Sequence, residues 1–406
     1  MTLTIRTISD DEIPAFRHAM MGTFGEDADD ADPDGTARVR KLIPTGRMWA
    51  AFDGAQVVGT AATLDHAISV PGGAALPMSG LTMVSVRPTH RRRGILREMI
   101  RLHLEEARTR RSPISGLWAS EASIYRRFGY GLASTSDALQ IDSASNVRFA
   151  DSWAEATSDE LAIVDEAQAR ERLPAIYARA TEHRPGALRR DDVWWEERRF
   201  LETPFARRGA SRRRHVIARR DGADVGYVAY RQRPKFVDGL PSGTVEIVEL
   251  HAIDARAEAS LWKFALSVDL FPTVTWWCAP VDCPLPWMLA DFRRVRRHRA
   301  DNLWLRIEDI PGALALRSYA HDGRLRFAIE GVTWELVVTD GKGRCTPTRE
   351  PAQLVFDRPT LGSLYLGGAP ASTLAKADLV RGDATALTVA DCLFGSAIAP
   401  WCPEIF

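Results

Sequence analysis

The chain has 406 residues, of which 45% are apolar and 26% charged, and its 53 basic side chains balance 53 acidic ones. These proportions are those of a globular protein of two to three domains, and zero net charge provides no general attraction to nucleic acid. The cysteines are odd in number and lack metal-ligand spacing, so we expect reduced thiols, no bound metal and a cytoplasmic protein without a signal peptide. The richest apolar stretch, Leu261 to Val281, is interrupted by Lys263 and Pro272, so we expect no membrane span.

The first elements predict a strand, a helix and an acidic loop. Leu3 to Thr7 alternates as a strand does, and Glu12 to Phe24 has the apolar spacing of a helix. The segment that follows, Gly25 to Gly35, is rich in aspartate and glutamate. Two interpretations stay open for it: a solvated acidic loop, or a loop that attracts a polycationic substrate.

A β-hairpin is predicted next. Apolar runs on both sides of Asp53-Gly54 make Arg47 to Leu64 a hairpin, because this dipeptide favours a tight turn. A segment rich in proline and glycine, Val70 to Gly80, then leads into an apolar strand that begins at Leu81 and stops at Pro88.

The residues after that strand predict a binding site for pyrophosphate. The run Arg91-Arg92-Arg93-Gly94 precedes a helix marked by Ile95, Met99 and Leu102. Glycine at the start of the helix lets backbone N–H groups meet an anion, and the arginines add positive charge. The pattern resembles the Arg/Gln-x-x-Gly-x-Gly/Ala signature of the GCN5-related N-acetyltransferases, although Leu96 departs from it; an ordinary basic turn is the alternative.

The next segments fit the same superfamily. Ile114 to Trp118 reads as a short buried strand, and Ser120 to Gly131 as a short helix that ends on Phe-Gly-Tyr. Acetyltransferases of this superfamily close their fold in this way, with a tyrosine of the helix beside the thioester sulfur. The alternative for Tyr125 is a core tyrosine whose hydroxyl is satisfied by the backbone.

Residues 141 to 300 repeat part of this plan. Arg220 to Ala229 echoes Phe52 to Ala62, and a strand and a helix follow. Where the first copy has its glycine, the second has none, and we expect Asp254 and Glu258 to repel a phosphate. The second copy is therefore predicted to be an acetyltransferase-like domain without a cofactor site, chance similarity of two hairpins being the alternative.

The last part is predicted to be a separate α+β unit that follows a basic run, Arg293 to Arg299. Strands are expected at Arg324 to Ile329 and Trp334 to Val338, and helices around Ser372 to Leu379 and Thr388 to Phe394. The chain ends in an apolar, proline-containing tail, whereas most C-termini are loose and polar. The tail is therefore expected to be docked.

Taken over its whole length, the chain resembles the Eis (enhanced intracellular survival) acetyltransferases of actinobacteria. The most specific parts are Val84-Ser85-Val86, PTHRRRGILR, Tyr125 in YRRFGY, and a final Phe406 after PWC. The resemblance implies an α+β chain of three domains: an acetyl-CoA-binding acetyltransferase domain over 1–140, a degenerate copy over 141–295 and a sterol-carrier-protein-like domain over 296–406 that delivers the C-terminal carboxylate. It also implies a homohexamer.

The resemblance further implies the site residues. Tyr125 would be the general acid and the Phe406 carboxylate the general base. Acetyl-CoA would be held by residues of the strand, the turn and the segment before Tyr125: Val84, Ser85, Val86, Arg92, Arg93, Gly94, Ile95, Leu96, Arg97, Ser120 and Glu121. The substrate would be bound by an aromatic residue and three acids: Phe24, Glu26, Asp27 and Glu404. A bulky residue such as Leu96, where the superfamily pattern has Gly or Ala, is usual in this family.

The implied reaction is acetyl transfer to amines of a polycationic aminoglycoside or peptide antibiotic. An ammonium must lose a proton before it attacks a thioester, and a partly buried carboxylate is a suitable base. Three other functions remain as alternatives: acetylation of lysine in proteins or peptides, N-myristoyl transfer, and a lipid carrier or interaction protein. Myristoyl transfer is disfavoured because it needs a long apolar pocket and has no counterpart of the third domain.

Overall fold

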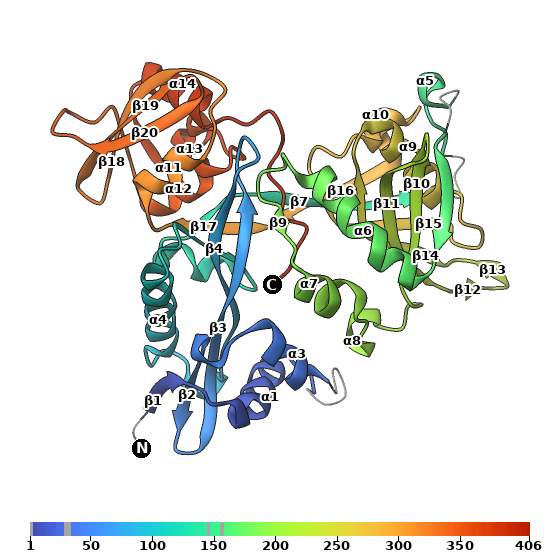
Figure 1. Ribbon diagram of the computed structural model, residues 1–406, viewed down its shortest axis with the longest axis horizontal. Coiled ribbons are helices and arrows are strands. Elements are labelled where there is room, and N and C mark those ends of the chain that lie inside the picture. Colours follow the sequence, from blue (N-terminus) through green and yellow to red (C-terminus); the bar gives the residue numbers. More distant parts are fainter. Residues whose placement is uncertain (1–2, 28–33, 144–146, 155–157) are drawn as a thin grey trace. The chain divides into compact units, whose positions relative to one another are not determined.

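Figure 1 shows a computed structural model of the chain, which describes residues 3–27, 34–143, 147–154 and 158–406. The chain forms two compact units. The first combines the described parts of Met1–Ser134 with Pro185–Glu197 and Asp301–Phe406, and the second combines those of Thr135–Arg184 with Arg198–Ala300. Each unit is described by itself below.

The first unit is built on a sheet with the strand order β1-β2-β3-β4-β5-β17-β6, to which β9 adds by pairing with β3. Its strands are β1 (Leu3–Thr7), β2 (Met48–Asp53), β3 (Gln56–Ser69), β4 (Ala75–Val86), β5 (Ile114–Trp118), β6 (Gly131–Leu132), β9 (Leu188–Arg189) and β17 (Leu303–Ile307). The pairing of β4 with β5 is parallel, and the neighbouring pairs are antiparallel.

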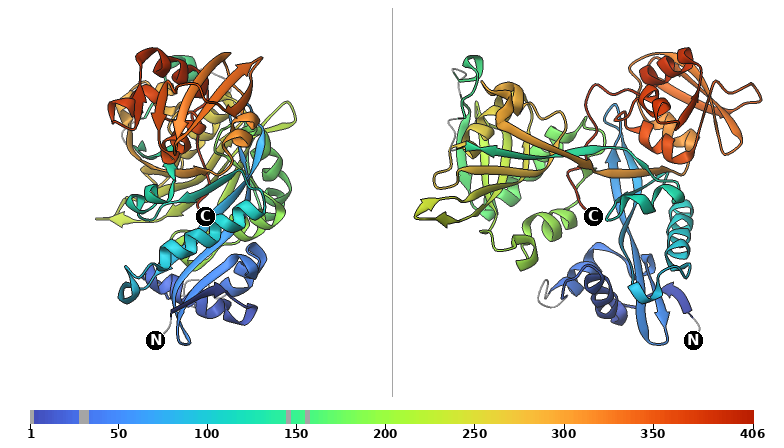
Figure 2. Two further views of the ribbon diagram at one scale, coloured as in Figure 1. Left: turned by 90° about the vertical axis from the view of Figure 1, so that its left-hand side faces the viewer. Right: turned by 180° about the vertical axis from the view of Figure 1, so that it is seen from behind.

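Helices cover both faces of this sheet (Figures 1 and 2). Helices α1 (Ile13–Thr23) and α3 (Gly35–Leu42) share a buried cluster with Ala50 and Ala62. Helix α4 (Ile95–Thr109) packs on the opposite face, in a cluster that contains Ala51 and Ala61. Because neighbouring residues of a strand point to opposite faces, this alternation places the two sets of helices on the two sides.

Most early predictions are confirmed. β1 has the expected bounds, and the predicted hairpin forms from β2 and β3, although its turn is Gly54-Ala55, one residue later than Asp53-Gly54, because Asp53 still pairs with Gln56. β4 starts earlier than expected, at Ala75, because a tight turn closed by a hydrogen bond from Val70 N to Ala74 O precedes it. The short helix expected around Tyr125 is two 3-10 turns, η4 (Ala122–Ile124) and η5 (Arg126–Phe128), which Gly129 ends with a positive φ of 89°.

The third part forms a five-stranded sheet with the order β20-β19-β18-β21-β22. Its strands are β18 (Gly323–Ile329), β19 (Val332–Thr339), β20 (Lys342–Pro347), β21 (Leu354–Phe356) and β22 (Val380–Gly382), and its helices are α11 (Ile310–Leu316), α12 (Arg358–Tyr365), α13 (Ala371–Lys376) and α14 (Ala384–Phe394). One hydrophobic cluster joins this part to the first sheet, through Leu305 of β17 and Met78 of β4. The C-terminal tail follows this part, whose hydrophobic core is continuous with that of the first sheet.

The second unit holds a seven-stranded sheet with the order β16-β7-β15-β14-β11-β10-β8. Its strands are β7 (Thr135–Asp142), β8 (Glu160–Val164), β10 (Arg214–Arg220), β11 (Ala223–Arg233), β14 (Thr244–Ala252), β15 (Thr273–Pro280) and β16 (Val295–Asp301), with a small hairpin of β12 (Phe236–Val237) and β13 (Leu240–Pro241). Its helices are α5 (Asp151–Ala154), α6 (Glu166–Thr181), α8 (Pro204–Arg207), α9 (Ala255–Leu266) and α10 (Leu285–Met288).

Two strands belong to a different sheet from the one that the predicted domain bounds imply. β7, most of which lies within residues 1–140, pairs with β15 of the second sheet. β17, from the interval 296–406, pairs with both β5 and β6 and so completes the first sheet. Its inward residues Leu303, Leu305 and Ile307 are fully buried. The first sheet therefore combines β1 to β6 with a strand that lies far along the chain, β17.

Candidate functional site

The strands β4 and β5 separate after three residue pairs. Their parallel pairing includes Met78 with Ile114, Ser79 with Ser115 and Gly80 with Gly116, and β4 then continues without β5 to Val86. Parallel strands that part in this way leave backbone groups of the longer strand facing an opening. An extended ligand can form hydrogen bonds with such an edge.

A β-bulge in β4 helps to open this edge. Thr82 pairs with Ala62 and Ser85 with Thr60, so an extra residue lies between them in β4, and Met83 there has a φ of 52°. The Thr60 hydroxyl donates to the Met83 carbonyl oxygen at 2.7 Å and holds the bulge in place. Beyond it, the N–H of Arg87 bonds to Val58 of β3. The N–H of Val86 therefore faces the other edge, the side of the opening.

The start of α4 has free capacity for an anion. Gly94 is the N-cap residue with a φ of 82°, and no side chain caps the helix. A Cβ at Gly94 would meet nothing within 4 Å, so the glycine is required by its backbone conformation and not by lack of space. Uncapped N–H groups at a helix start carry partial positive charge and bind phosphate well.

Exposed arginines surround this helix start. Arg92, Arg93 and Arg97 are exposed, and in the described ranges no acidic side chain is paired with any of them. By contrast, Arg101 one turn further along α4 forms ion pairs with Glu98 and Glu105. The positive charge available to a ligand therefore lies at the beginning of the helix, next to Ile95 and Leu96.

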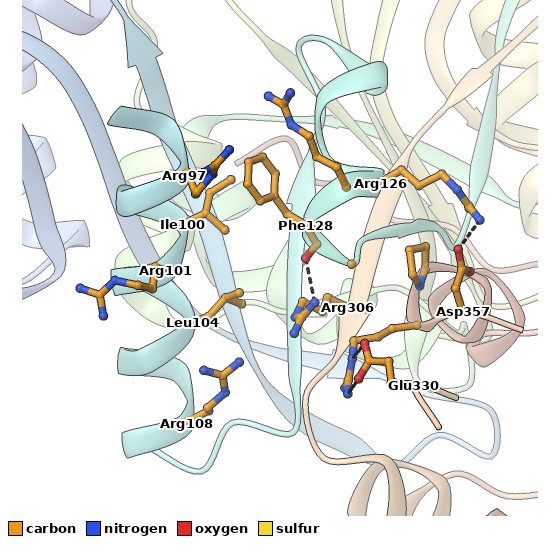
Figure 3. Close-up of a pocket in the computed structure, with 14 residues that line it drawn as sticks. Arg97, Ile100, Arg101, Leu104, Arg108, Arg126, Phe128, Arg306, Glu330 and Asp357 are labelled. Carbon is orange, nitrogen blue, oxygen red and sulfur yellow. Dashed lines mark hydrogen bonds and ion pairs between the residues drawn. The ribbon is translucent and has the colours of Figure 1, made fainter. Parts of the chain in front are cut away.

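A basic cavity of about 430 Å³ lies beside α4, whose residues Arg97, Ile100 and Leu104 line it (Figure 3). Part of its charge is balanced, since Arg126 pairs with Asp357 and Arg358 with Glu330. Arg97 and Arg127 also line it, and no acidic partner for either occurs among the residues that the structure describes. These two side chains therefore give the cavity positive charge that is available to a ligand.

Tyr125 lies between the two 3-10 turns and is only 4% exposed. Burial raises the pKa of its hydroxyl above the usual value, and a hydrogen bond with the side chain of Ser120 partly opposes this rise. The ring also contacts Tyr130 edge-on, at 6.2 Å between centroids. The hydroxyl therefore stays protonated at neutral pH and can donate a proton. Ser120 and Glu121, just before it, are exposed.

The tail is docked, as its composition predicts, and it ends beside the point where β4 and β5 separate. The ring of Phe406 lies so close to Gly80 that a Cβ there would be 3.0 Å from it. The same ring contacts His66 of β3, at 4.7 Å between centroids. Upstream, the Asn302 side chain bonds to both the N–H and the carbonyl of Cys402, each at 3.0 Å. The last residue is thus held against the first sheet.

Glu404 does not match the expectation that it faces a substrate. Its carboxylate is 1% exposed, and its two oxygens are bound by Arg190 Nε at 2.5 Å and by Trp194 Nε1 at 2.9 Å. At 1% exposure, a carboxylate already held by a guanidinium and an indole N–H is closed off from a substrate amine. We therefore correct its assignment from substrate ligand to anchor of the tail.

The remaining substrate candidates lie at the end of α1. Phe24 is 51% exposed, Asp27 is exposed and Glu26 is half-buried. The inner face of α1 belongs to the same hydrophobic cluster as Met83 and Phe406. Asp29, Asp30 and Asp32 of the acidic loop lie outside the described residues.

The sequence analysis missed the residues that hold the tail. Arg190 and Trp194 belong to Pro185–Glu197, which leaves the second unit to join the first, and α7 (Asp192–Trp194) lies in it. Figure 1 shows the C-terminus beside α7. His66 and Asn302 come from β3 and from the residue before β17. Nothing local in the sequence marks these residues, because their common feature is a contact with distant residues 402–406.

The second sheet carries no comparable site. Its α9 starts at Asp254, whose carboxylate accepts from the Ala257 N–H at 2.8 Å. Glu258, expected to repel a phosphate, is half-buried in the first turn of α9, and its carboxylate contacts Trp262 and Cys283. Within residues 3–27, 34–143, 147–154 and 158–406, no group of three or more His, Cys, Asp or Glu side chains could hold a metal ion. No helix in these ranges is long and apolar enough to cross a bilayer.

Comparison with protein families gives three matches along the chain. Residues 4–133 and 186–307 each match an acetyltransferase (GNAT) domain, and residues 310–403 match a sterol carrier protein domain. The three matches follow the order that the sequence analysis predicts. They support an α+β chain of two acetyltransferase-type domains and a sterol-carrier-type domain.

Individual relatives match over nearly the full length. The N-acetyltransferase Eis of Mycobacterium tuberculosis is 37% identical over 414 residues, with 98% of each chain covered. An uncharacterized N-acetyltransferase of Streptomyces avermitilis is 35% identical over the whole of both chains. Among solved structures, Eis1 of Mycobacterium abscessus is 28% identical, with a TM-score of 0.83 over 99% of this chain and 100% of that one.

Proposed function

Because the chain belongs to the Eis family of GCN5-related N-acetyltransferases, we propose that it acetylates amines of a polycationic small molecule, such as an aminoglycoside or a basic peptide antibiotic. The position of Phe406 against Gly80, where β4 and β5 separate, carries this proposal. It brings a carboxylate-bearing residue to the edge at which an extended thioester ligand would bind. Acetylation as such follows from the family, whereas the acceptor and the residue roles are proposed.

Acetyl-CoA supplies the acetyl thioester, and three features of the site suit it. The free edge of β4 at Val84, Ser85 and Val86 suits the amide groups of its pantetheine arm. The uncapped start of α4, at Gly94, Ile95 and Leu96, with Arg92 and Arg93, suits its pyrophosphate. Arg97 and Arg127 of the basic cavity suit its remaining phosphate. Ser120 and Glu121, exposed just before Tyr125, would border the bound cofactor.

In the proposed reaction the Phe406 carboxylate takes the proton from the substrate ammonium, because only the neutral amine is a nucleophile. Backbone N–H groups near the bulge at Met83 polarise the carbonyl that is attacked. The Tyr125 hydroxyl, which is protonated at neutral pH, then donates its proton to the departing thiolate, and the second proton that the acetylated nitrogen loses returns to the phenolate. Phe24, Glu26 and Asp27 would attract the cationic acceptor. A homohexameric state and a cytoplasmic location are also proposed, on the resemblance to Eis proteins.

The test supplies purified protein with acetyl-CoA and a panel of aminoglycosides, polyamines and lysine peptides, and follows release of free thiol. We expect turnover on the aminoglycosides, with mass spectrometry reporting the number of acetyl groups added. Faster turnover on the lysine peptides would move the acceptor class to protein amines. Silence across the whole panel would contradict the proposal.

A further inference from the structure

We propose that Arg190 and Trp194 are positioning residues that hold the terminal carboxylate in place through Glu404. The inference rests on the proposed role of Phe406 as the base. It adds that the segment Pro185–Glu197, far from the catalytic residues in sequence, acts as the holder of the tail. Neither residue needs to touch the substrate for this role.

The first argument is the burial of the anchor. Arg190 and Glu404 side chains are 0% and 1% exposed, and their ion pair measures 2.5 Å. Trp194 supplies the second hydrogen bond to the same carboxylate, at 2.9 Å. Removal of one partner from a buried pair leaves an uncompensated charge, which the protein avoids by moving that group to water. Loss of Arg190 would therefore expel Glu404 and the two residues after it.

The second argument is a chain of ring contacts from the holder to the last residue. The Trp194 ring meets His66 edge-on at 4.9 Å between centroids, and His66 meets Phe406 at 4.7 Å. Trp194 therefore bonds directly to the tail at Glu404 and is linked indirectly, through His66, to Phe406. Ile405 between them is 46% exposed and contributes little burial. The side chains of residues 404 and 406 fix where the terminal carboxylate lies.

The third argument is the close fit between Trp401, earlier in the tail, and the start of the segment Pro185–Glu197. The Trp401 N–H bonds to the Pro185 carbonyl at 2.8 Å, and a Cβ at Gly186 would lie 3.1 Å from the Trp401 backbone. The tail thus runs against the holder from residue 401 to residue 404. A loose terminus would spend most of its time away from the reacting amine, and catalysis falls steeply with small misplacement of a base. The anchor therefore raises the fraction of molecules that are ready to react.

The test compares the full chain with Arg190→Gln, Glu404→Gln and the double variant. Carboxypeptidase is added to the folded protein, and mass spectrometry follows the loss of Phe406, while kcat and the acetyl-CoA Kd are measured separately. We expect Arg190→Gln to accelerate trimming and to lower kcat by about tenfold or more, with Kd unchanged. The double variant replaces the ion pair by two neutral amides, and it should regain part of the resistance to trimming and part of the kcat. Glu404→Gln alone should lie between wild type and Arg190→Gln.

Arg220→Gln is the matched control, because Arg220 pairs with Asp159, whose side chain is also 0% exposed, and has no link to the tail. It should lower Tm without changing trimming or kcat. If Arg190→Gln lowers Tm but leaves trimming and kcat at wild-type values, the inference is wrong. Should Arg190→Gln fail to fold, Trp194→Phe removes the N–H donor together with part of the ring, and unchanged trimming in that variant would equally contradict the inference.

Deletion of Phe406 separates this inference from the proposed function. Full activity after deletion would overturn the role of the terminal carboxylate itself. An inactive deletion variant, together with normal trimming and kcat in Arg190→Gln, would overturn only the proposed positioning role of Arg190 and Trp194.

Discussion

Two helix starts in this chain occupy equivalent places in related folds and differ in what they offer a ligand. Helix α4 in the first unit begins at Gly94, with no capping side chain and with exposed arginines beside it. Helix α9 in the second unit begins at Asp254, which caps the helix with its own carboxylate. Arg220 then pairs with Asp254 at 2.7 Å and with Asp159 at 2.8 Å.

The difference shows how a phosphate site is closed. In the second copy, a carboxylate takes the N–H groups that a phosphate would use, and a guanidinium neutralises that carboxylate. The helix start is satisfied internally, so no anion is needed to complete it. In the first copy both the N–H groups and the arginines remain available. Repulsion by Glu258, expected from the sequence, is not needed for this, because the carboxylate of that first-turn residue is engaged with Trp262 and Cys283.

The largest effect is expected from Tyr125→Phe, which tests whether only the first copy performs chemistry. Loss of the proton donor should lower kcat about 100-fold and leave the acetyl-CoA Kd nearly unchanged. Steady-state thiol release and calorimetry measure the two quantities. A variant that keeps full kcat would mean that Tyr125 is a core tyrosine, or that the second copy is active.

The next largest effect is expected from placing an aspartate at Gly94, where the corresponding helix of the second unit has Asp254. Gly94→Asp should weaken acetyl-CoA binding by about 100-fold, from backbone strain at a φ of 82° and from charge repulsion. Gly94→Asn is the matched control, since asparagine tolerates this conformation equally well without the charge. It should weaken binding only about tenfold. Equal Kd values for the two variants, from calorimetry, would rule out the charge argument.

These first two predictions also mark the limit of the sequence analysis. Gly94, the arginine run and Tyr125 could be found because each belongs to a short local pattern. The two hairpins were found in the same way. Strand β17 and the anchors Arg190, His66 and Asn302 could not be found, because their roles depend on contacts across 100 residues or more, as between Asn302 and Cys402. Glu404 was misassigned because an acid near a terminus looks accessible until its burial is known.

A smaller effect is expected from the buried acid of the second unit. Burial raises the pKa of Glu258 to about 7 from 4.5. Its contribution to stability is therefore fully present below pH 4.5 and is lost as the pH rises through 7, by on the order of 3 kcal/mol. Glu258→Gln should flatten this part of the pH profile, which hydrogen exchange of α9 at several pH values can follow. An unchanged slope would show that Glu258 is not the titrating group.

The smallest effect concerns the cavity beside α4. Arg127→Gln should reduce the preference for CoA over 3′-dephospho-CoA about fivefold, the scale of one exposed ion pair. Arg101→Gln is the matched control, because Arg101 is already neutralised by Glu98 and Glu105. Competition binding with the two nucleotides measures the preference. An equal loss for both nucleotides in Arg127→Gln would place the phosphate elsewhere.

The terminal carboxylate itself is tested most directly by chemical ligation at Cys402, which joins the peptide of residues 402–406 with either a free carboxylate or a carboxamide at Phe406. The amide keeps the ring of Phe406 and the anchor of Glu404, and removes only the proposed base. We predict that the carboxylate form regains wild-type kcat, whereas the amide form loses about 100-fold in kcat with an unchanged acetyl-CoA Kd. An amide form as active as its carboxylate counterpart would contradict the account.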